Sequence, residues 1–308
     1  MELASITFQQ VGILFLLIFS GALCARLGVL RPEYKQAFSN LLLYLVVPVM
    51  VVNSYMTEFD PAMGANLLKA FGWSALAIGI GLGVTFGLTR GWDGGEAALQ
   101  RFACIFSNAA YMGFPLIQAL FGAEGLIYAS AYVTVFNVLL WTLGYAMVSG
   151  RARKQEVLHS IFTSPVLYAV ILGIGIYFLR VPVPVLLRKP CELIASMNTP
   201  LSMVITGMLI AASDLRQVVR SLRLWSVAAL RLLLIPAVSI GVFWLLGLRG
   251  MVAVVVLLLE ACPCAAITSI FAVQFHHDEQ SAAGMVVVTT LLSILTLPLC
   301  AMLLTMMG

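Results

Sequence analysis

The sequence predicts an all-α polytopic membrane protein, with ten transmembrane helices arranged as two inverted five-helix repeats. Three observations predict this class: the chain of 308 residues is 62% hydrophobic, only 10% of its residues are charged, and its mean hydropathy is +1.05. Soluble domains carry about 25% charged residues. A soluble fold of this length could not bury so much apolar surface, so we expect neither a soluble enzyme nor a nucleic-acid-binding protein.

Ten segments are apolar and long enough to cross a bilayer, which takes about 20 residues of helix. The first segment has no basic region before it and no cleavage signal after it, so we expect a mature membrane helix rather than a signal peptide. The predicted spans are residues 6–27, 35–55, 66–89, 98–121, 125–148, 161–179, 190–213, 219–246, 251–274 and 279–305.

The basic residues predict how the chain is oriented. Most of the 17 lysines and arginines lie in one set of loops and helix ends, which includes the central segment 149–160, SGRARKQEVLHS. The positive-inside rule places this set in the cytoplasm. We therefore expect both termini outside, and we expect the bacterial cytoplasmic (inner) membrane as the location.

The basic segment 149–160 divides the spans into two groups of five, residues 1–148 and residues 161–308. An odd number of helices in each half gives related halves opposite orientations, as in many secondary transporters. The second span of each half contains a proline, Pro48 and Pro200, and the fourth span of each half is interrupted. These matching features favour two inverted repeats.

The interruptions are residues 107–115, SNAAYMGFP, and residues 260–266, EACPCAA. Proline has no amide hydrogen and clashes with the carbonyl four residues earlier, whereas glycine relaxes the backbone. Gly113, Pro115 and Pro263 therefore predict broken fourth and ninth spans. One such segment alone is compatible with a simple proline kink, but paired interruptions are typical of a transporter substrate site.

The half-helices that follow the two breaks should begin near the bilayer midplane with their N-termini together. Helix N-termini offer free N–H groups and partial positive charge, which favours a bound carboxylate. We predict a secondary active transporter of a small organic anion, with no cofactor and with H+ or Na+ as the coupling ion. The predicted substrate-binding residues are Asn108, Gly113, Pro115, Pro263, Thr268, Ser269 and Arg231.

Arg231 and Glu260 are charged residues within predicted spans. At 1.5 Å per residue they lie about 18 Å and about 14 Å into their spans, near the middle of about 30 Å of hydrocarbon. A lone charge there costs at least about 2.5–3.5 kcal/mol, so we expect the two to pair. Two interpretations stay open: Arg231 holds substrate or Glu260 carries a proton, or the two form a structural pair.

Residues 108–122, NAAYMGFPLIQALFG, resemble the fourth-helix motif of the auxin efflux carrier family, Asn-x-x-x-x-Gly-x-Pro-Leu followed by Phe/Tyr-Gly. Residues 262–299 are similar to its ninth and tenth helices, and the resemblance covers essentially the whole chain. It implies that the fourth and ninth spans cross at their breaks. Asn108 matches the family's crossover asparagine, and Pro115 and Pro263 match its crossover prolines.

The same resemblance implies a division between a scaffold and a moving part. Spans 1, 2, 6 and 7 would form the scaffold, and spans 3–5 and 8–10 a transport domain that works by alternating access. Bacterial members are associated with malonate, malate and similar organic anions, and plant members with auxin export. We also expect a homodimer. Glu260 and the two cysteines beside Pro263 depart from the family pattern.

Cys262-Pro263-Cys264 suggests an alternative, a transition-metal transporter, because cysteine thiolates bind Cu(I) and Zn(II). Metal pumps with such a motif also need a nucleotide domain, for which this chain has no room. His276 and His277 lie about 18–20 Å from Cys264 along a helix, too far to share a metal. We therefore expect small buried cysteines and no metal site. A non-transporting membrane sensor is a third class, and no enzyme motif is present.

Overall fold

The computed structural model describes residues 2–31, 33–150, 165–212 and 221–304. Within these ranges the regular secondary structure is helical, and the β-type pairing is an isolated antiparallel bridge between Ser107 and Cys264. The all-α prediction is therefore confirmed for the described residues. The predicted cytoplasmic segment 149–160 lies outside them beyond residue 150.

The first half of the chain begins with a long helix and contains three π-helical turns, labelled η. Its elements are α1 (Glu2–Arg26), α2 (Tyr34–Leu41), η1 (Leu42–Val46), α3 (Val47–Ser54), α4 (Pro61–Leu88), α5 (Ala97–Ile105), η2 (Ala109–Gly113), α6 (Phe114–Leu139), η3 (Leu140–Gly144) and α7 (Tyr145–Ser149).

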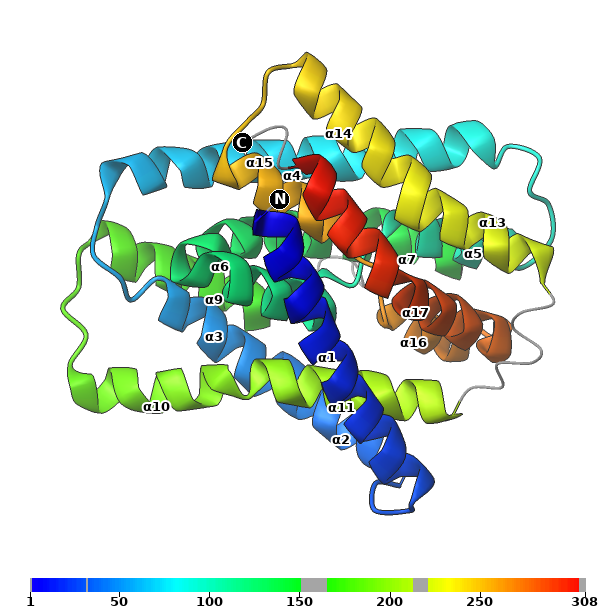
Figure 1. Cartoon of the computed structure of the whole chain (residues 1–308), viewed down its shortest axis with the longest axis horizontal. Coiled ribbons are helices and arrows are strands. Elements are labelled where there is room, and N and C mark those ends of the chain that lie inside the picture. Colours follow the sequence, from blue (N-terminus) through cyan, green and yellow to red (C-terminus); the bar gives the residue numbers. More distant parts are fainter. Residues whose placement is uncertain (1, 32, 151–164, 213–220, 305–308) are drawn as a thin grey trace.

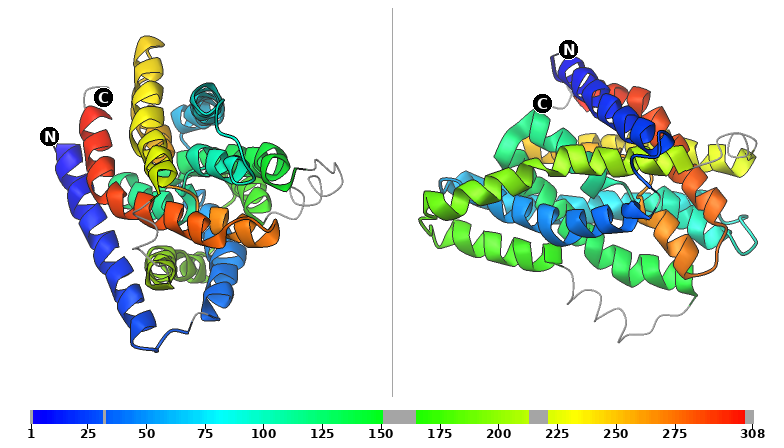
Figure 2. Two further views of the ribbon diagram at one scale, coloured as in Figure 1. Left: turned by 90° about the vertical axis from the view of Figure 1, so that its right-hand side faces the viewer. Right: turned by 90° about the horizontal axis from the view of Figure 1, so that it is seen from below.

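The second half ends with a long helix that returns to the start of the chain. Figures 1 and 2 show α17 ending close to the beginning of α1, and these two helices are in contact. The elements of this half are α9 (Pro165–Phe178), α10 (Val185–Ser196), α11 (Asn198–Ala212), α13 (Leu222–Ala229), η4 (Leu230–Leu234), α14 (Ile235–Leu245), α15 (Met251–Glu260), α16 (Ile267–Gln274) and α17 (Glu279–Leu304).

Seven helical stretches of the described chain are long and apolar enough to cross a membrane. One of them, Ala109–Ser149, has 41 residues and contains a non-helical residue, Gly122, with φ 59° and ψ −144°. It therefore covers parts of two predicted spans. The apolar helices α9 and α15 are shorter. Every predicted range contains helix, while the arrangement as ten spans in two inverted repeats stays a prediction.

The third span begins earlier than predicted. We expected it at residue 66, but α4 begins at Pro61. The side chain of Asp60 accepts a hydrogen bond from the Ala62 N–H at 2.8 Å, and Pro61 occupies the first helical position. This cap stabilises a polar first turn that hydropathy alone does not detect.

Three of the π-helical turns in the described chain lie just before a proline, with one residue between the turn and the proline. The turns η1, η2 and η4 end two residues before Pro48, Pro115 and Pro236. A proline ring clashes with the carbonyl four residues earlier, which in each case lies inside the wider turn. Pro48 and Pro236 are therefore accommodated within continuous helices, whereas Pro115 follows a break in the chain.

The core surrounds α15, whose residues Val252–Glu260 are all buried. Helices α4 and α6 pack against it. Because a short helix buried on all sides lacks a polar face, its sequence is an almost uninterrupted run of valine and leucine. This arrangement places Glu260, the last residue of α15, in the interior of the protein.

Helices α1 and α11 make the most extensive helix–helix contact of the described chain, and Figure 1 shows them crossing. A Cβ atom at Gly21 would lie 2.6 Å from the carbonyl oxygen of Val204, and one at Gly207 would collide with the backbone of Ile18 and Ala22. Glycine at both positions lets the two backbones approach, as small residues do between membrane helices.

We predict that Gly207→Leu separates α1 from α11 and lowers the unfolding temperature of the protein in detergent, because the larger side chain meets backbone that cannot move aside. The cost of such overpacking is about 1–3 kcal/mol. Gly12→Leu in α1 is the control, since a Cβ at Gly12 meets no atom within 4 Å. Equal unfolding temperatures for the two variants would contradict the prediction.

Candidate functional site

The predicted breaks in the fourth and ninth spans are present, and they meet. The chain between α5 and η2 and the chain between α15 and α16 run antiparallel beside each other. The Asn108 N–H donates to the Pro263 carbonyl at 2.7 Å, and the Ala265 N–H donates to the Phe106 carbonyl at 2.9 Å. Each break thus supplies partners for backbone groups of the other, which matters where no water is available.

Arg231, on η4, is fully buried against these breaks. Its Nε donates to the Cys262 carbonyl at 3.0 Å, and its Nη1 donates to the carbonyls of Cys104 and Ile105 at 2.9 Å each. These carbonyls lie at or just beyond the C-terminal ends of α5 and α15, where helices have unpaired acceptors and partial negative charge. One side chain therefore caps two helix ends.

Arg231 also pairs with Glu260, as the sequence predicts. The Arg231 Nη1 lies 3.4 Å from the Glu260 Oε1, and both side chains are fully buried. The Tyr132 hydroxyl donates to the other carboxylate oxygen at 2.6 Å and lies 3.1 Å from the Ser107 hydroxyl. A Cβ at Gly81 of α4 would lie 3.1 Å from the Glu260 Oε1, so glycine makes room for the carboxylate.

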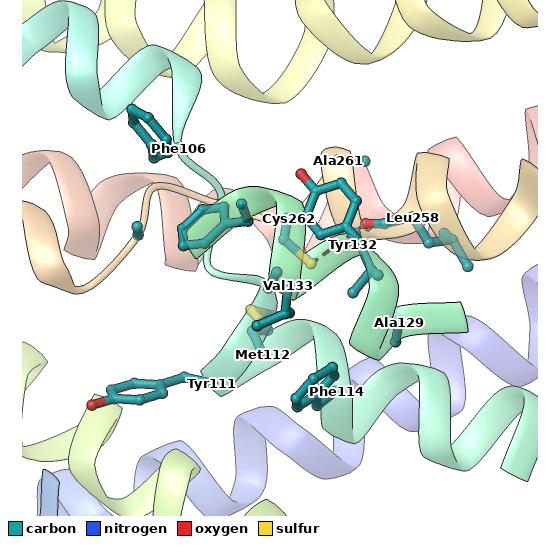
Figure 3. Close-up of a cluster of buried hydrophobic side chains, with 14 of the residues drawn as sticks. Phe106, Tyr111, Met112, Phe114, Ala129, Tyr132, Val133, Leu258, Ala261 and Cys262 are labelled. Carbon is teal, nitrogen blue, oxygen red and sulfur yellow. Dashed lines mark hydrogen bonds between the residues drawn. The ribbon is translucent and has the colours of Figure 1, made fainter. Parts of the chain in front are cut away.

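Sequence reasoning did not find Tyr132. It lies on α6, in a predicted span, and nothing in its local sequence distinguishes it from a tyrosine in the core. Figure 3 shows its ring in the buried cluster with Cys262 and Leu258 beside the breaks. Its role follows only from the fold, which brings it to Glu260 from 128 residues away in the sequence.

Asn108 joins the break to the helix that follows. Its main-chain carbonyl accepts hydrogen bonds from the N–H groups of Met112 and Gly113 at 3.0 and 3.1 Å. The residue as a whole is 4% exposed, and its side chain makes no hydrogen bond to another described residue. A carboxamide can both donate and accept hydrogen bonds, so the Asn108 side chain is a good candidate for contact with a ligand or water.

Gly113 and Pro115 shape the same helix start. A Cβ at Gly113 would lie 2.5 Å from the side chain of Leu259 on α15, so glycine allows the crossing helices to touch. Pro115 is buried in the first turn of α6, where its missing N–H costs little. These two residues set the backbone, and no side-chain hydrogen bond is available from either.

Thr268 and Ser269 lie in the first turn of α16. Both hydroxyl oxygens are buried and have no hydrogen-bond partner among the described residues. The same is true of the Nη2 of Arg231 and of the Thr290 hydroxyl on α17. The interior around the breaks therefore contains several polar atoms whose hydrogen-bonding capacity is unused within the described chain.

The cysteines and histidines of the ninth span lie apart. Cys262 and Cys264 are buried thiols, as predicted, and the Cys262 thiol donates to the Leu258 carbonyl. The His277 Nε2 lies 3.0 Å from the Val148 carbonyl. No group of three His, Cys, Asp or Glu side chains in the described part of the chain is arranged to hold a metal ion.

Known proteins are similar in sequence to this chain over nearly its whole length. A family model described as "Membrane transport protein" matches residues 6–161 and 153–301. The chain belongs to this family. The resemblance to the auxin efflux carriers is thereby confirmed, because this is their family, and the protein is an integral membrane protein.

Individual relatives of this membrane transport protein are distant but match from end to end. An "Uncharacterized transporter" of Methanothermobacter thermautotrophicus is 24% identical over 92% of this chain and 93% of its own length. An "Uncharacterized transporter" of Methanocaldococcus jannaschii is 23% identical over 96% of this chain and 97% of its own length. A protein of Rhizobium meliloti named "Putative malonate transporter" is 23% identical over 92% of this chain and 91% of its own length.

We predict that Arg231→Met destabilises the transporter more than Glu260→Gln does. Methionine leaves both helix ends uncapped and an unpaired carboxylate behind, a loss of about 3–5 kcal/mol. Glutamine keeps the shape of Glu260 and leaves Arg231 on its carbonyls, so the loss is smaller.

Unfolding temperatures of the two variants in the same detergent measure this difference. Tyr55→Phe is a matched control, because the Tyr55 hydroxyl bonds a buried hydroxyl, that of Ser130, away from the breaks. A larger loss for Glu260→Gln than for Arg231→Met would mean that the ion pair, rather than the capping of helix ends, is the stabilising interaction.

Proposed function

We propose that the protein is a secondary active transporter that carries a small organic anion, a carboxylate or dicarboxylate, across the membrane by alternating access. The observation that carries this proposal is the meeting of the two breaks, from which the N-terminal ends of η2 and α16 both depart. Helix N-termini favour anions. The unpartnered Asn108 side chain and the Thr268 and Ser269 hydroxyls supply neutral hydrogen bonds there.

The charges around the breaks also favour an anion that is accompanied by a proton. Each helix terminus is equivalent to about half an elementary charge. The Glu260 carboxylate pairs directly with Arg231, and summed over the breaks the charges of these two residues and of the four helix ends cancel. Protonation of Glu260 would leave about one unit of positive charge for the substrate to neutralise. We therefore propose H+ as the coupling ion and Glu260 as its carrier.

Arg231 has a structural role in this proposal. Its Nε and Nη1 are occupied by main-chain carbonyls and by Glu260, so these atoms are not free to bind substrate. Only its Nη2 has no partner among the described residues. We propose that Arg231 fixes the crossing and adds at most this one donor to a bound anion.

The substrate class is supported by the relative named "Putative malonate transporter", which matches over almost the entire chain. A dicarboxylate such as malonate would place one carboxylate at the helix N-termini beside Asn108. Cys262 and Cys264 have no part in this proposal, since they are buried without other metal-ligating side chains arranged around them in the described chain.

Helix contacts support the predicted division into a scaffold and a transport domain. The extensive pairs α1–α11 and α3–α9 lie within predicted scaffold spans, and the pairs α4–α6 and α15–α6 lie within the predicted transport domain. The contacts of α1 with α17 and α6, of α3 with α6 and of α11 with η2 join the two sets. We propose ten spans in two inverted repeats, with both termini outside the cytoplasmic membrane and two copies forming a homodimer.

Uptake into proteoliposomes tests the proposal. We predict uptake of labelled malonate or malate that depends on a proton gradient, and a loss of at least about tenfold for Asn108→Ala, because a hydrogen bond to a charged group contributes about 1.5–3 kcal/mol. Asn137→Ala, which removes a half-buried carboxamide of α6 outside the breaks, should retain uptake.

Two further variants separate the roles of the interior groups. Glu260→Gln should abolish the dependence on the proton gradient, and Cys262→Ala/Cys264→Ala should transport at close to the wild-type rate. Metal-ion uptake that is lost in the cysteine variant would favour a metal transporter instead. No uptake of any carboxylate by folded wild-type protein would favour a membrane sensor.

A further inference from the structure

An apolar groove lies on the predicted scaffold, between α3, α9 and α10. Its volume is about 620 Å³, and its walls are almost entirely aliphatic or aromatic. The residues that line it are Pro48, Val49, Val52, Met56, Pro165, Tyr168, Ala169, Leu172, Ile176, Val181, Pro182, Val183, Pro184, Leu187 and Cys191.

The groove has the length of one lipid leaflet. On α9 it is lined by Pro165, Ala169, Leu172 and Ile176, which share one face of the helix. Eleven residues of helix separate the first from the last, or about 16 Å at 1.5 Å per residue. Half of a hydrocarbon core of about 30 Å is about 15 Å. An extended acyl chain in one leaflet therefore fits along α9.

A polar cavity of about 710 Å³ opens at one end of this groove. The two share Met56, Ile176, Val181 and Val183 as lining residues, so they adjoin each other. The polar cavity adds three charged residues to its lining: Glu58, Arg180 and Arg188. An apolar groove that ends at charged residues has the amphipathic form of a lipid site.

Arg180 is exposed, and its guanidinium lies against an aromatic ring. Its backbone has φ 52°, unusual for a residue other than glycine, and its guanidinium lies 4.3 Å from the centre of the Phe59 ring. It forms no ion pair or hydrogen bond through its side chain with the other described residues. Arg188 uses its Nε to bind Glu192, which also binds Lys189. Both arginines are thus suited to a phosphate.

We propose that this space binds a phospholipid, independently of the transport site, with one acyl chain along α9 and the phosphate between Arg180 and Arg188. The Glu58 carboxylate in the same cavity would repel an anionic headgroup and attract an amine. The preferred lipid is therefore a zwitterionic one with a primary amine, phosphatidylethanolamine, rather than phosphatidylglycerol. A bound lipid would tie α9 to α3 and α10 within the scaffold.

Native mass spectrometry of the purified full-length protein tests this site with phosphatidylethanolamine and phosphatidylglycerol as probes. We expect one retained phosphatidylethanolamine per copy, and about tenfold less retention for Arg180→Gln/Arg188→Gln. Arg249→Gln is the control, because Arg249 is an exposed arginine that lines neither the groove nor the polar cavity. Glu58→Gln should remove the preference for the amine headgroup.

Cys191 provides a second measurement, because it lines the groove while Cys104, Cys262, Cys264 and Cys300 are buried. In a Cys24→Ser background, phosphatidylethanolamine should slow the labelling of Cys191 by a maleimide severalfold, and malonate should not. Unfolding temperatures of the wild-type protein and of the Arg180→Gln/Arg188→Gln variant, both measured without lipid, check that the two proteins are folded.

Three results would overturn the proposal. Retention of lipid unchanged by Arg180→Gln/Arg188→Gln would mean that the arginines do not hold a phosphate. Efficient disulfide formation between Cys191 residues of two copies, unaffected by lipid, would make the groove an interface with a second copy. Protection of Cys191 by malonate alone would assign the space to the transport route.

Discussion

The guanidinium of Arg231 satisfies the two helix ends that the breaks leave inside the protein. A break in a membrane helix exposes carbonyls that no water can reach, and each unpaired group costs several kcal/mol. Arg231 donates to carbonyls at the ends of both α5 and α15, and Glu260 offsets its charge at 3.4 Å. The extended segments can therefore lie side by side and pair through Asn108 and Ala265.

The other buried features of the interior follow from this arrangement. Glu260 has to be desolvated to reach Arg231, so it requires a second partner, the Tyr132 hydroxyl, and room beside α4, which Gly81 provides. The C-terminal ends are then occupied, and the N-terminal ends of η2 and α16 are left beside an unpartnered Asn108 side chain. The asymmetry between capped C-termini and available N-termini is what gives the proposed site its preference for an anion.

Local features of the sequence predicted much of this structure, and long-range contacts supplied the rest. Hydropathy located the helices, Pro115 and Pro263 located the breaks, and the cost of isolated charges predicted that Arg231 and Glu260 pair. The three main-chain carbonyls that bind Arg231 could not be predicted, because main-chain acceptors have no signature in the sequence. Tyr132 was missed for a related reason, because its contact with Glu260 depends on where α6 packs. The start of α4 was predicted too late because it depends on the side-chain cap from Asp60 rather than on hydropathy.

The position of a bound anion in an experimental structure would show directly whether the helix N-termini, rather than Arg231, hold the substrate. A brominated dicarboxylate such as bromosuccinate, located by the anomalous scattering of bromine, reports that position without interpretation of weak density. We expect a peak at the N-terminal ends of η2 and α16, in contact with the Asn108 side chain, with Arg231 still bound to the carbonyls of Cys104, Ile105 and Cys262. A peak elsewhere in the transporter, or an Arg231 that leaves those carbonyls to bind the anion, would contradict it.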